Sequence, residues 1–194
     1  MALTMTLVGF AAGSLPLSLW LGRLALGVDV RDFGPDRNPG AGNVWRAGGP
    51  ALGIAAAVLD IAKAAAPIAV ARFALGISGW ALLPVALAPI LGHDFSPLLG
   101  FRGGKGVAAT FGAWLALGGP LAMLGLAVCF GLFYALRFPD AWTDIAGVTL
   151  FSLGLVATGA ATVLVAVAVA SLGLLTWTNR AELREAPRPQ LRSR

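Results

Sequence analysis

Long apolar segments joined by short polar ones make up most of the chain. Residues 2–22, 51–75 and 80–99 are apolar at nearly every position, and a polar stretch at 27–49 follows the first of them. A helix needs about 20 apolar residues to cross the hydrocarbon core of a bilayer. Each of the three segments is long enough, so the pattern predicts three membrane-spanning helices.

A fourth apolar segment, 107–136, is too long for a single span. The sequence Gly-Gly-Pro at 118–120 interrupts it, and glycine followed by proline is a strong turn signal. We therefore predict two helices here, over 107–117 and 120–136.

The last apolar segment, 141–175, is again too long for one helix, and we place its break near Gly159. The total is seven helices. Composition agrees, because 58% of the residues are apolar and 12% are charged, against about 45–50% and about 25% in soluble domains. We predict an all-α polytopic membrane protein, with one seven-helix domain over residues 1–180 and a basic cytoplasmic tail over 181–194.

The basic residues orient this arrangement. With the N-terminus outside and the C-terminus inside, the basic residues that lie inside are Arg23, Arg31, Arg37, Arg46, Arg102, Lys105, Arg137, Arg180, Arg184, Arg188, Arg192 and Arg194. Only Arg72 falls outside, and Lys63 sits within a span, so the positive-inside rule supports this topology. The first segment lacks a basic start and is expected to stay as a helix, not to be cleaved as a signal peptide. The net charge of +5 follows from this topology and requires no nucleic-acid partner.

A single cysteine and a single histidine limit the chemistry. Cys129 has no partner for a disulfide within the chain and lies among apolar residues, which is typical of packing. With His93 as the only histidine there is little material for a zinc or iron site. We expect no metal and no cofactor.

The first polar block, 34–46, combines turn formers with amide and guanidinium side chains. Asn38, Asn43 and Arg46 could converge on one anion, because the planar fork of arginine bonds two phosphate oxygens at once. The alternative is a solvated loop that carries positive-inside charge.

The second polar block, 92–106, ends in a glycine-rich loop around Lys105. Gly103, Gly104 and Gly106 free the backbone to aim successive N–H groups at one point, and a helix begins directly afterwards. A lysine beside a helix N-terminus and free backbone amides is the arrangement that binds oxyanions and phosphates. The alternative is a flexible turn with one interfacial lysine. His93, in the same block, is a candidate to orient this loop or to contact substrate.

Two charged residues fall inside a predicted span. Asp60 and Lys63 are three positions apart and share a helix face. Charges within a membrane are costly and usually paired, so we favour a buried ion pair that fixes helix packing over a proton or ion pathway. Gly9 and Gly13 in the first span permit close helix approach.

The second block resembles a known family. Gly-Phe-Arg-Gly-Gly-Lys-Gly-Val-Ala at 100–108, preceded by Gly92-His93 and Phe95-x-Pro97, is similar to the signature of the bacterial acyl-phosphate:glycerol-3-phosphate acyltransferases, the PlsY family. Further similar segments lie at 13–16, 22–23, 28–31, 38–46 and 59–63. The resemblance implies a seven-helix inner-membrane enzyme with its site on the cytoplasmic side. Such an enzyme transfers a fatty acyl group from acyl phosphate to the 1-hydroxyl of glycerol 3-phosphate, giving lysophosphatidic acid and phosphate.

The same resemblance implies a set of site residues. The catalytic positions are Asn38, Arg46 and Lys105, and we add Asp36 as a substitute base. The substrate-binding positions are Gly40, Asn43, His93, Gly103, Gly104, Gly106 and Asn179. We expect acyl phosphate, glycerol 3-phosphate and the bilayer as partners, no cofactor, and a monomer.

The chain departs from the family pattern at three positions. Asp36 stands where the family has serine, Gly42 where it has threonine, and Thr176 where it has histidine. Asp36 is a candidate base, but its charge would repel a phosphate and favour a neutral or cationic acceptor. Two alternatives therefore stay open: a homologue with an altered acceptor or no catalysis, and a transporter or binding protein for an anionic lipid precursor.

Overall fold

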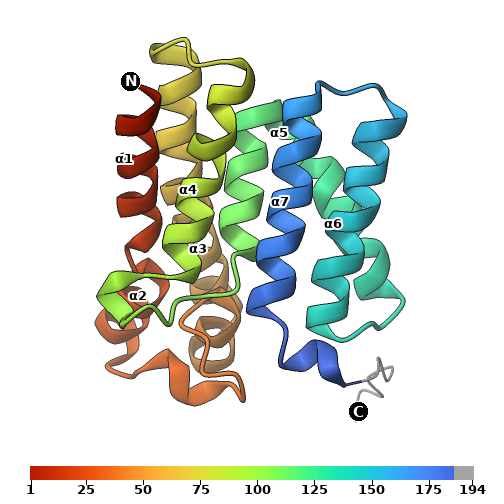
Figure 1. Ribbon diagram of the computed structural model, residues 1–194. Helices are drawn as coiled ribbons and strands as arrows, with labels where there is room; N and C mark the ends of the chain where they lie inside the picture. Colours follow the sequence, from red (N-terminus) through yellow and green to blue (C-terminus); the bar gives the residue numbers. More distant parts are fainter. Residues whose placement is uncertain (186–194) are drawn as a thin grey trace.

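The computed structural model describes residues 1–185, and these residues form helices and turns without any strand (Figure 1). The predicted all-α class is confirmed. The helices are α1 (Ala2–Ser14), α2 (Leu17–Leu26), α3 (Ala41–Ala69), α4 (Leu82–Asp94), α5 (Val107–Ala135), α6 (Asp140–Ala157) and α7 (Thr162–Thr178). Short helical turns are η1 (Val30–Phe33), η2 (Val70–Ala74), η3 (Gly79–Ala81), η4 (Pro97–Leu99) and η5 (Glu182–Arg184). Of the predicted tail, residues 186–194 lie outside the described part.

Most of this chain is long and apolar enough to lie in a bilayer. Among the described residues, the stretches with the length and composition of a membrane span are Ala2–Leu26, Ala41–Ala74, Gly79–Leu99, Val107–Ala135 and Asp140–Ala157. The helix Thr162–Thr178 is apolar but shorter. Seven spans and their orientation stay a prediction.

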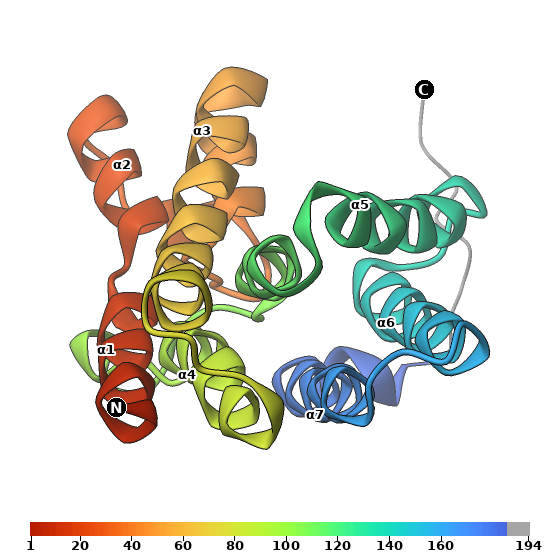
Figure 2. The ribbon, with the colours of Figure 1, turned by 90° about the horizontal axis from the view of Figure 1, so that it is seen from above.

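The helix α5 breaks where the Gly-Gly-Pro sequence predicts. Gly119 has φ 71° and ψ −169°, a non-helical conformation inside the element. The rings of Phe111 and Phe130 lie 5.2 Å apart between centroids, whereas the same 19 positions along a straight helix would span about 28 Å. The chain therefore doubles back at Gly119, and Figure 2 shows the two parts of α5 displaced from each other. The break predicted near Gly159 also occurs, since α6 ends at Ala157 and the next helix begins at Thr162.

A second Gly-Gly-Pro, at residues 48–50, breaks α3 in the same way. Gly49 has φ 79° and ψ −176°, a region that essentially only glycine adopts. A Cβ on Gly53 would lie 2.6 Å from that of Trp45, so the short helix before the break packs against the long one after it. The second half of the polar stretch is thus helical and not only a solvated loop.

Glycines let α1 and α4 pack closely. A Cβ on Gly13 would overlap the carbonyl oxygen of Pro89, and one on Gly92 would overlap that of Phe10. Small residues spaced four apart allow two helix backbones to approach in this way. The expectation for Gly9 and Gly13 is therefore confirmed.

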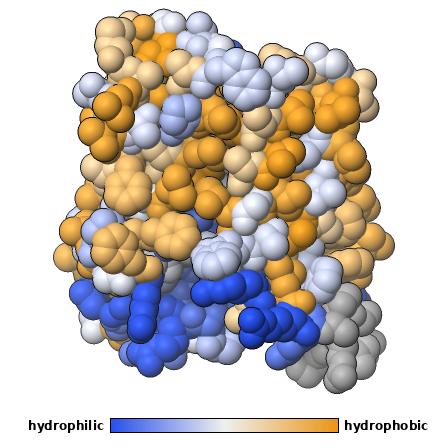
Figure 3. All heavy atoms as spheres, viewed as in Figure 1, coloured by the Kyte–Doolittle hydropathy of each residue, from blue (hydrophilic) through white to orange (hydrophobic). Residues whose placement is uncertain are grey.

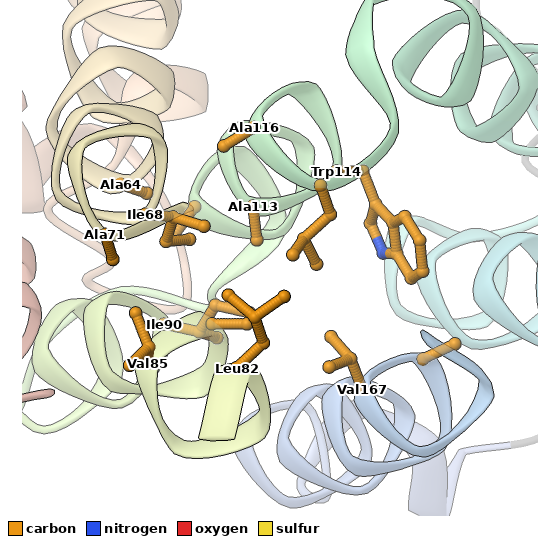
Figure 4. Packing of buried hydrophobic residues seen from close by; sticks show 14 of the residues in the cluster. Ala64, Ile68, Ala71, Leu82, Val85, Ile90, Ala113, Trp114, Ala116 and Val167 are labelled. Carbon is orange, nitrogen blue, oxygen red and sulfur yellow. The ribbon is translucent and has the colours of Figure 1, made fainter. Parts of the chain in front are cut away.

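The main core lies where α3, α4, α5 and α7 meet (Figure 4). Ile68, Ile90 and Val167 are fully buried there. Trp114 is 1% exposed and packs edge-on against Phe151, with ring centroids 4.7 Å apart. A smaller core of Leu19, Val30, Val44 and Ala56 lies between α2, η1 and α3, and it supports the loop that precedes α3.

The one basic residue predicted outside has a structural reason to be there. Arg72 donates hydrogen bonds to the carbonyl oxygens of Ala116 and Leu117, just before the break in α5. The last carbonyls of a helix have no partner within that helix, and none is available from lipid. Arg72 therefore replaces the hydrogen bonds that the break removes.

Polar residues gather at one end of the bundle, the lower end in Figures 1 and 3. The chain begins at the opposite end and returns to the polar end after α7. The connections at 27–40, 100–106 and 136–139 all lie at this polar end (Figure 1). The segments that carry the predicted inside charges are therefore together.

We expect Ala181→Cys, in a Cys129→Ala background, to be protected from an impermeant thiol reagent in intact cells. The polar end carries the basic segments, and the positive-inside rule places it inside. Thr158→Cys, in the exposed turn at the opposite end, serves as the matched control and should react. Labelling of Ala181→Cys in intact cells would contradict the orientation.

Gly13→Ala should destabilise the protein by about 1–3 kcal/mol. The added methyl group meets a backbone carbonyl of α4, which cannot rotate away. Gly154→Ala is the control, because nothing lies within 4 Å of a Cβ at that position. The two variants should differ in thermal unfolding midpoint in the same detergent, and equal midpoints would refute the close contact.

Candidate active site

Four segments meet at the polar end around two adjoining cavities. The smaller cavity has a volume of about 480 Å³ and lies between the loop before α3, α3 itself, α5 and α6. The other has a volume of about 830 Å³ and is also bordered by the segment after α7. Both are lined by Asp36, Arg46, Lys105 and Asp140. The two blocks that the sequence singled out therefore come together.

The first block is held by its own amides. Asn38 Oδ1 accepts from the N–H of Gly40 at 2.9 Å, and Asn43 Nδ2 donates to the carbonyl oxygen of Asn38 at 2.7 Å. Asn43 is 2% exposed, and its Oδ1 accepts from Arg46 Nη1 at 2.6 Å. Gly40, as the N-cap of α3, places these residues at the start of the helix. Asn43 thus aims the guanidinium of Arg46 toward the cavities.

Lys105 forms ion pairs with two carboxylates of the site. Its Nζ lies 2.8 Å from Asp36 Oδ2 and also forms an ion pair with Glu182. Burial opposes the charged form of Asp36, but the hydrogen bond and charge of Lys105 outweigh burial, so the pKa of Asp36 is lowered. Burial likewise opposes the charged form of Lys105, but its two carboxylate partners raise its pKa overall. Both groups are therefore ionised at neutral pH.

The glycine loop differs from the expected cradle. The N–H of Gly103 donates to the carbonyl oxygen of Asp94 at 3.0 Å, and that of Gly104 donates to His93 at 2.9 Å. These two N–H groups are therefore engaged with the end of α4 and do not point at a common anion. Side chains at either position would overlap His93, so the glycines serve close packing. Of the three glycines around Lys105, only Gly106, the N-cap of α5, has a positive φ, of 77°.

The start of α5 still faces the site. Val107 and Ala108 line the smaller cavity, and the first N–H groups of a helix carry partial positive charge. Thr178 Oγ1 donates to the carbonyl oxygen of Lys105 at 3.3 Å, which joins the end of α7 to the loop. The groups of this segment that are available to an anion are thus the side chain of Lys105 and the start of α5.

His93 contributes in two ways. Its carbonyl oxygen orients the glycine loop, and its buried side chain lines the smaller cavity. Behind it, His93 Nδ1 lies 4.0 Å from Asp60 Oδ1. His93 therefore separates the polar cluster inside the bundle from the loop that carries Lys105.

The pair of Asp60 and Lys63 fixes the joint between α1 and α2. Lys63 Nζ lies 2.8 Å from Asp60 Oδ1 and donates to the carbonyl oxygen of Leu15 at 2.6 Å. Ser18 Oγ donates to Asp60 Oδ2 at 2.5 Å. The ion pair itself lies within α3, but the other two contacts join α3 to α2 and to the link between α1 and α2, so they favour the packing role.

Three acidic residues of the site escaped the sequence reasoning. Asp140 Oδ2 lies 3.9 Å from Arg46 Nη2, and Glu182 reaches Lys105. Asp144 lines the smaller cavity and accepts a hydrogen bond from Asn179 Nδ2 at 3.4 Å. The spacing of Asp140 and Asp144, four apart at the start of an apolar helix, is the one signal that could have identified them.

The remaining predicted positions have distinct places. Asn179 is 1% exposed and meets the site through Asp144. Thr176 is exposed, and its Oγ1 donates to the carbonyl oxygen of Leu172 in its own helix. Gly42 lines both the smaller cavity and a neighbouring groove, with nothing within 4 Å of a Cβ. The position therefore has room for a larger side chain.

Comparisons with known proteins identify the family of this chain. The family described as glycerol-3-phosphate acyltransferase matches residues 3–186. A glycerol-3-phosphate acyltransferase of Anaeromyxobacter sp. strain Fw109-5 is 45% identical over 157 residues, which are 79% of this chain and 76% of that protein. One from Thermus thermophilus is 38% identical over 178 residues, which are 92% and 87% of the two chains.

A solved structure is similar over nearly the whole chain. It is the crystal structure of PlsY, an integral membrane glycerol 3-phosphate acyltransferase, in its glycerol 3-phosphate form. The match has a TM-score of 0.85 and 28% identity, and it covers 94% of this chain and 90% of that one.

Proposed function

The chain belongs to the glycerol-3-phosphate acyltransferase family, and we propose that it transfers a fatty acyl group from acyl phosphate to the 1-hydroxyl of glycerol 3-phosphate. The products are lysophosphatidic acid and inorganic phosphate. One observation carries this proposal: Lys105 and Arg46 line the same two cavities at the polar end of an apolar bundle. Two anionic groups can therefore be held side by side.

The chemistry requires positioning more than a reactive side chain. Acyl phosphate is a mixed anhydride, and phosphate is a good leaving group, so no protein nucleophile is needed. The site must hold both substrates, stabilise the oxyanion and orient the acceptor hydroxyl. Cationic and backbone groups of the site suit these tasks.

The acceptor phosphate is assigned to Arg46. Asn43 holds its guanidinium through Nη1, which leaves the other N–H groups for two phosphate oxygens. Asn38 maintains the loop through its bonds to Gly40 and Asn43. The donor phosphate is assigned to Lys105 and the start of α5, whose charge opposes that of the departing group.

The bond changes balance within the two substrates. The 1-hydroxyl oxygen of glycerol 3-phosphate bonds to the acyl carbon, and the bond from that carbon to the phosphate oxygen breaks. The hydroxyl proton passes to the leaving phosphate, either directly or by way of Asp36. We place this reaction on the cytoplasmic side of the inner membrane, in a monomer and without a cofactor.

A homologue with an altered acceptor is the second candidate. Two cations, Arg46 and Lys105, border the cavities beside six acidic side chains, which are those of Asp36, Asp60, Asp140, Asp144, Glu182 and Glu185. An excess of acidic groups around the cavities repels a dianion and so favours a neutral or cationic acceptor.

Purified protein with a long-chain acyl phosphate and a panel of acceptors tests the two candidates. Lysophosphatidic acid should form with glycerol 3-phosphate, and glycerol or an amino alcohol should be poor acceptors. Preference for a neutral or cationic acceptor would support the second candidate. A protein that acylates nothing in the panel would refute both.

Arg46→Lys should raise the KM for glycerol 3-phosphate by about tenfold, equivalent to about 1.4 kcal/mol. Lysine keeps the charge but cannot bond two oxygens in one plane. The KM for acyl phosphate should change much less. Arg37→Lys, an exposed position that pairs with Asp32, is the control. A change confined to the KM for acyl phosphate would rule out Arg46 as the group that binds the acceptor phosphate.

Lys105→Ala should give a folded protein with kcat lower by about 10²–10³. The charge is proposed to act most strongly as negative charge reaches the leaving phosphate, so its loss lowers kcat as well as affinity. Gly104→Ala should also be poor, because a Cβ there would overlap His93 and displace the loop.

Arg102→Ala is the matched control, since Arg102 is exposed on the same loop and lines neither cavity. It should retain near wild-type rates. If Lys105→Ala and Gly104→Ala do so too, the glycine loop is only a turn.

A further inference from the structure

The segment after α7 closes one side of the larger cavity. Ala181, Glu182 and Glu185 all line it. One end is fixed where Thr178 donates to the carbonyl oxygen of Lys105. The other is fixed where Trp142 Nε1 donates to the carbonyl oxygen of Glu185 at 3.1 Å. The segment thus bridges the glycine loop and α6.

A tight turn within this segment presents Glu182 to Lys105. The N–H groups of Glu182 and Leu183 both donate to the carbonyl oxygen of Asn179 at 3.0 Å. The carboxylate of Glu182 then forms an ion pair with Lys105, which also pairs with Asp36. A lysine ammonium has three N–H donors, so two of its directions are taken by carboxylates of the protein itself.

The two carboxylates are held very differently. Asp36 has a side chain that is 19% exposed, and it accepts further hydrogen bonds from the N–H of Asn38 and from Asn43 Nδ2. The side chain of Glu182 is 41% exposed, and Lys105 is the one group that its carboxylate pairs with among residues 1–185. Glu182 also has one more rotatable bond. It is therefore the carboxylate that can leave Lys105.

We infer that Glu182 is the anion that a substrate phosphate replaces on Lys105, and that it sets which anions the site accepts. A phosphate ester carries nearly two charges and three acceptor oxygens, against one charge on a carboxylate. It can therefore displace Glu182, whereas a singly charged or neutral group gains too little to do so. This inference rests on the proposed function only in taking that phosphate to be the donor's.

The same exchange assists the end of the reaction. When inorganic phosphate leaves Lys105, the carboxylate of Glu182 returns to it, so the partly buried ammonium regains its second carboxylate partner beside Asp36. Glu182 therefore weakens phosphate binding before and after the transfer, and discriminates by charge.

Glu182→Gln tests the inference in the full-length protein purified in detergent. Binding of inorganic phosphate, measured by calorimetry, should tighten by about tenfold, and the KM for acyl phosphate should fall by a similar factor. The KM for the acceptor should change much less. Trp142→Phe, which frees the far end of the segment, should shift phosphate binding in the same direction by a smaller factor.

Glu185→Gln is the matched control, because it removes a carboxylate from the same segment and keeps the backbone bond to Trp142. It should change phosphate binding much less than Glu182→Gln does, because the ion pair with Lys105 is made by Glu182. Unchanged phosphate binding in Glu182→Gln would overturn the inference, and so would an equal gain in Glu185→Gln. The calorimetric measurement needs no turnover. If neither the wild type nor any variant makes lysophosphatidic acid, but Glu182→Gln still binds phosphate more tightly than the wild type, the proposed function fails and the inference stands.

Discussion

Every interruption of a helix in an apolar bundle leaves backbone N–H and C=O groups without hydrogen-bond partners, and lipid offers none. Several polar groups of this chain supply the missing hydrogen bonds. Lys63 donates to the carbonyl oxygen of Leu15 where α1 gives way to α2. Arg72 donates to that of Leu117 where α5 breaks. The N–H groups of residues 103–104 do the same at the end of α4. Charges that appear misplaced in the sequence are thus partners of broken helices.

The site inherits its rigidity from this constraint. The glycine loop is hydrogen-bonded to the end of α4 through the N–H groups of residues 103–104, and these bonds fix the position of Lys105. On this side of the cavities, the lysine side chain and the start of α5 are the groups left to bind an anion. On the other side of the cavities, the side chain of Asn43 fixes the guanidinium of Arg46 by accepting a hydrogen bond from it. Two cations are held by independent supports, which suits a reaction that joins two anionic substrates without a protein nucleophile.

Local features were predictable and long-range ones were not. The turn signals at 118–120 and Gly159 located the breaks, because they depend on the conformation of adjacent residues. The sequence grouped Asn43 and Arg46 by residue type, as side chains suited to one anion, and the two do lie together. The role of the glycine loop was mistaken, since its N–H groups are taken by a helix that precedes it. Glu182 joins Lys105 across 77 positions, and no local pattern reveals such a contact. The short helix before Gly49 was missed because its polar residues resemble those of a loop.

The two Gly-Gly-Pro sequences use the same backbone geometry to reverse a helix, with a φ of 79° at Gly49 and 71° at Gly119. The second of them contains no charged or hydrogen-bonding side chain. The hairpin formed by the two halves of α5 can therefore enter a bilayer as one preformed unit, its tip crossing without the cost of transferring a charge. A lysine introduced into the tip would add that cost, and we expect it to hinder insertion of the hairpin.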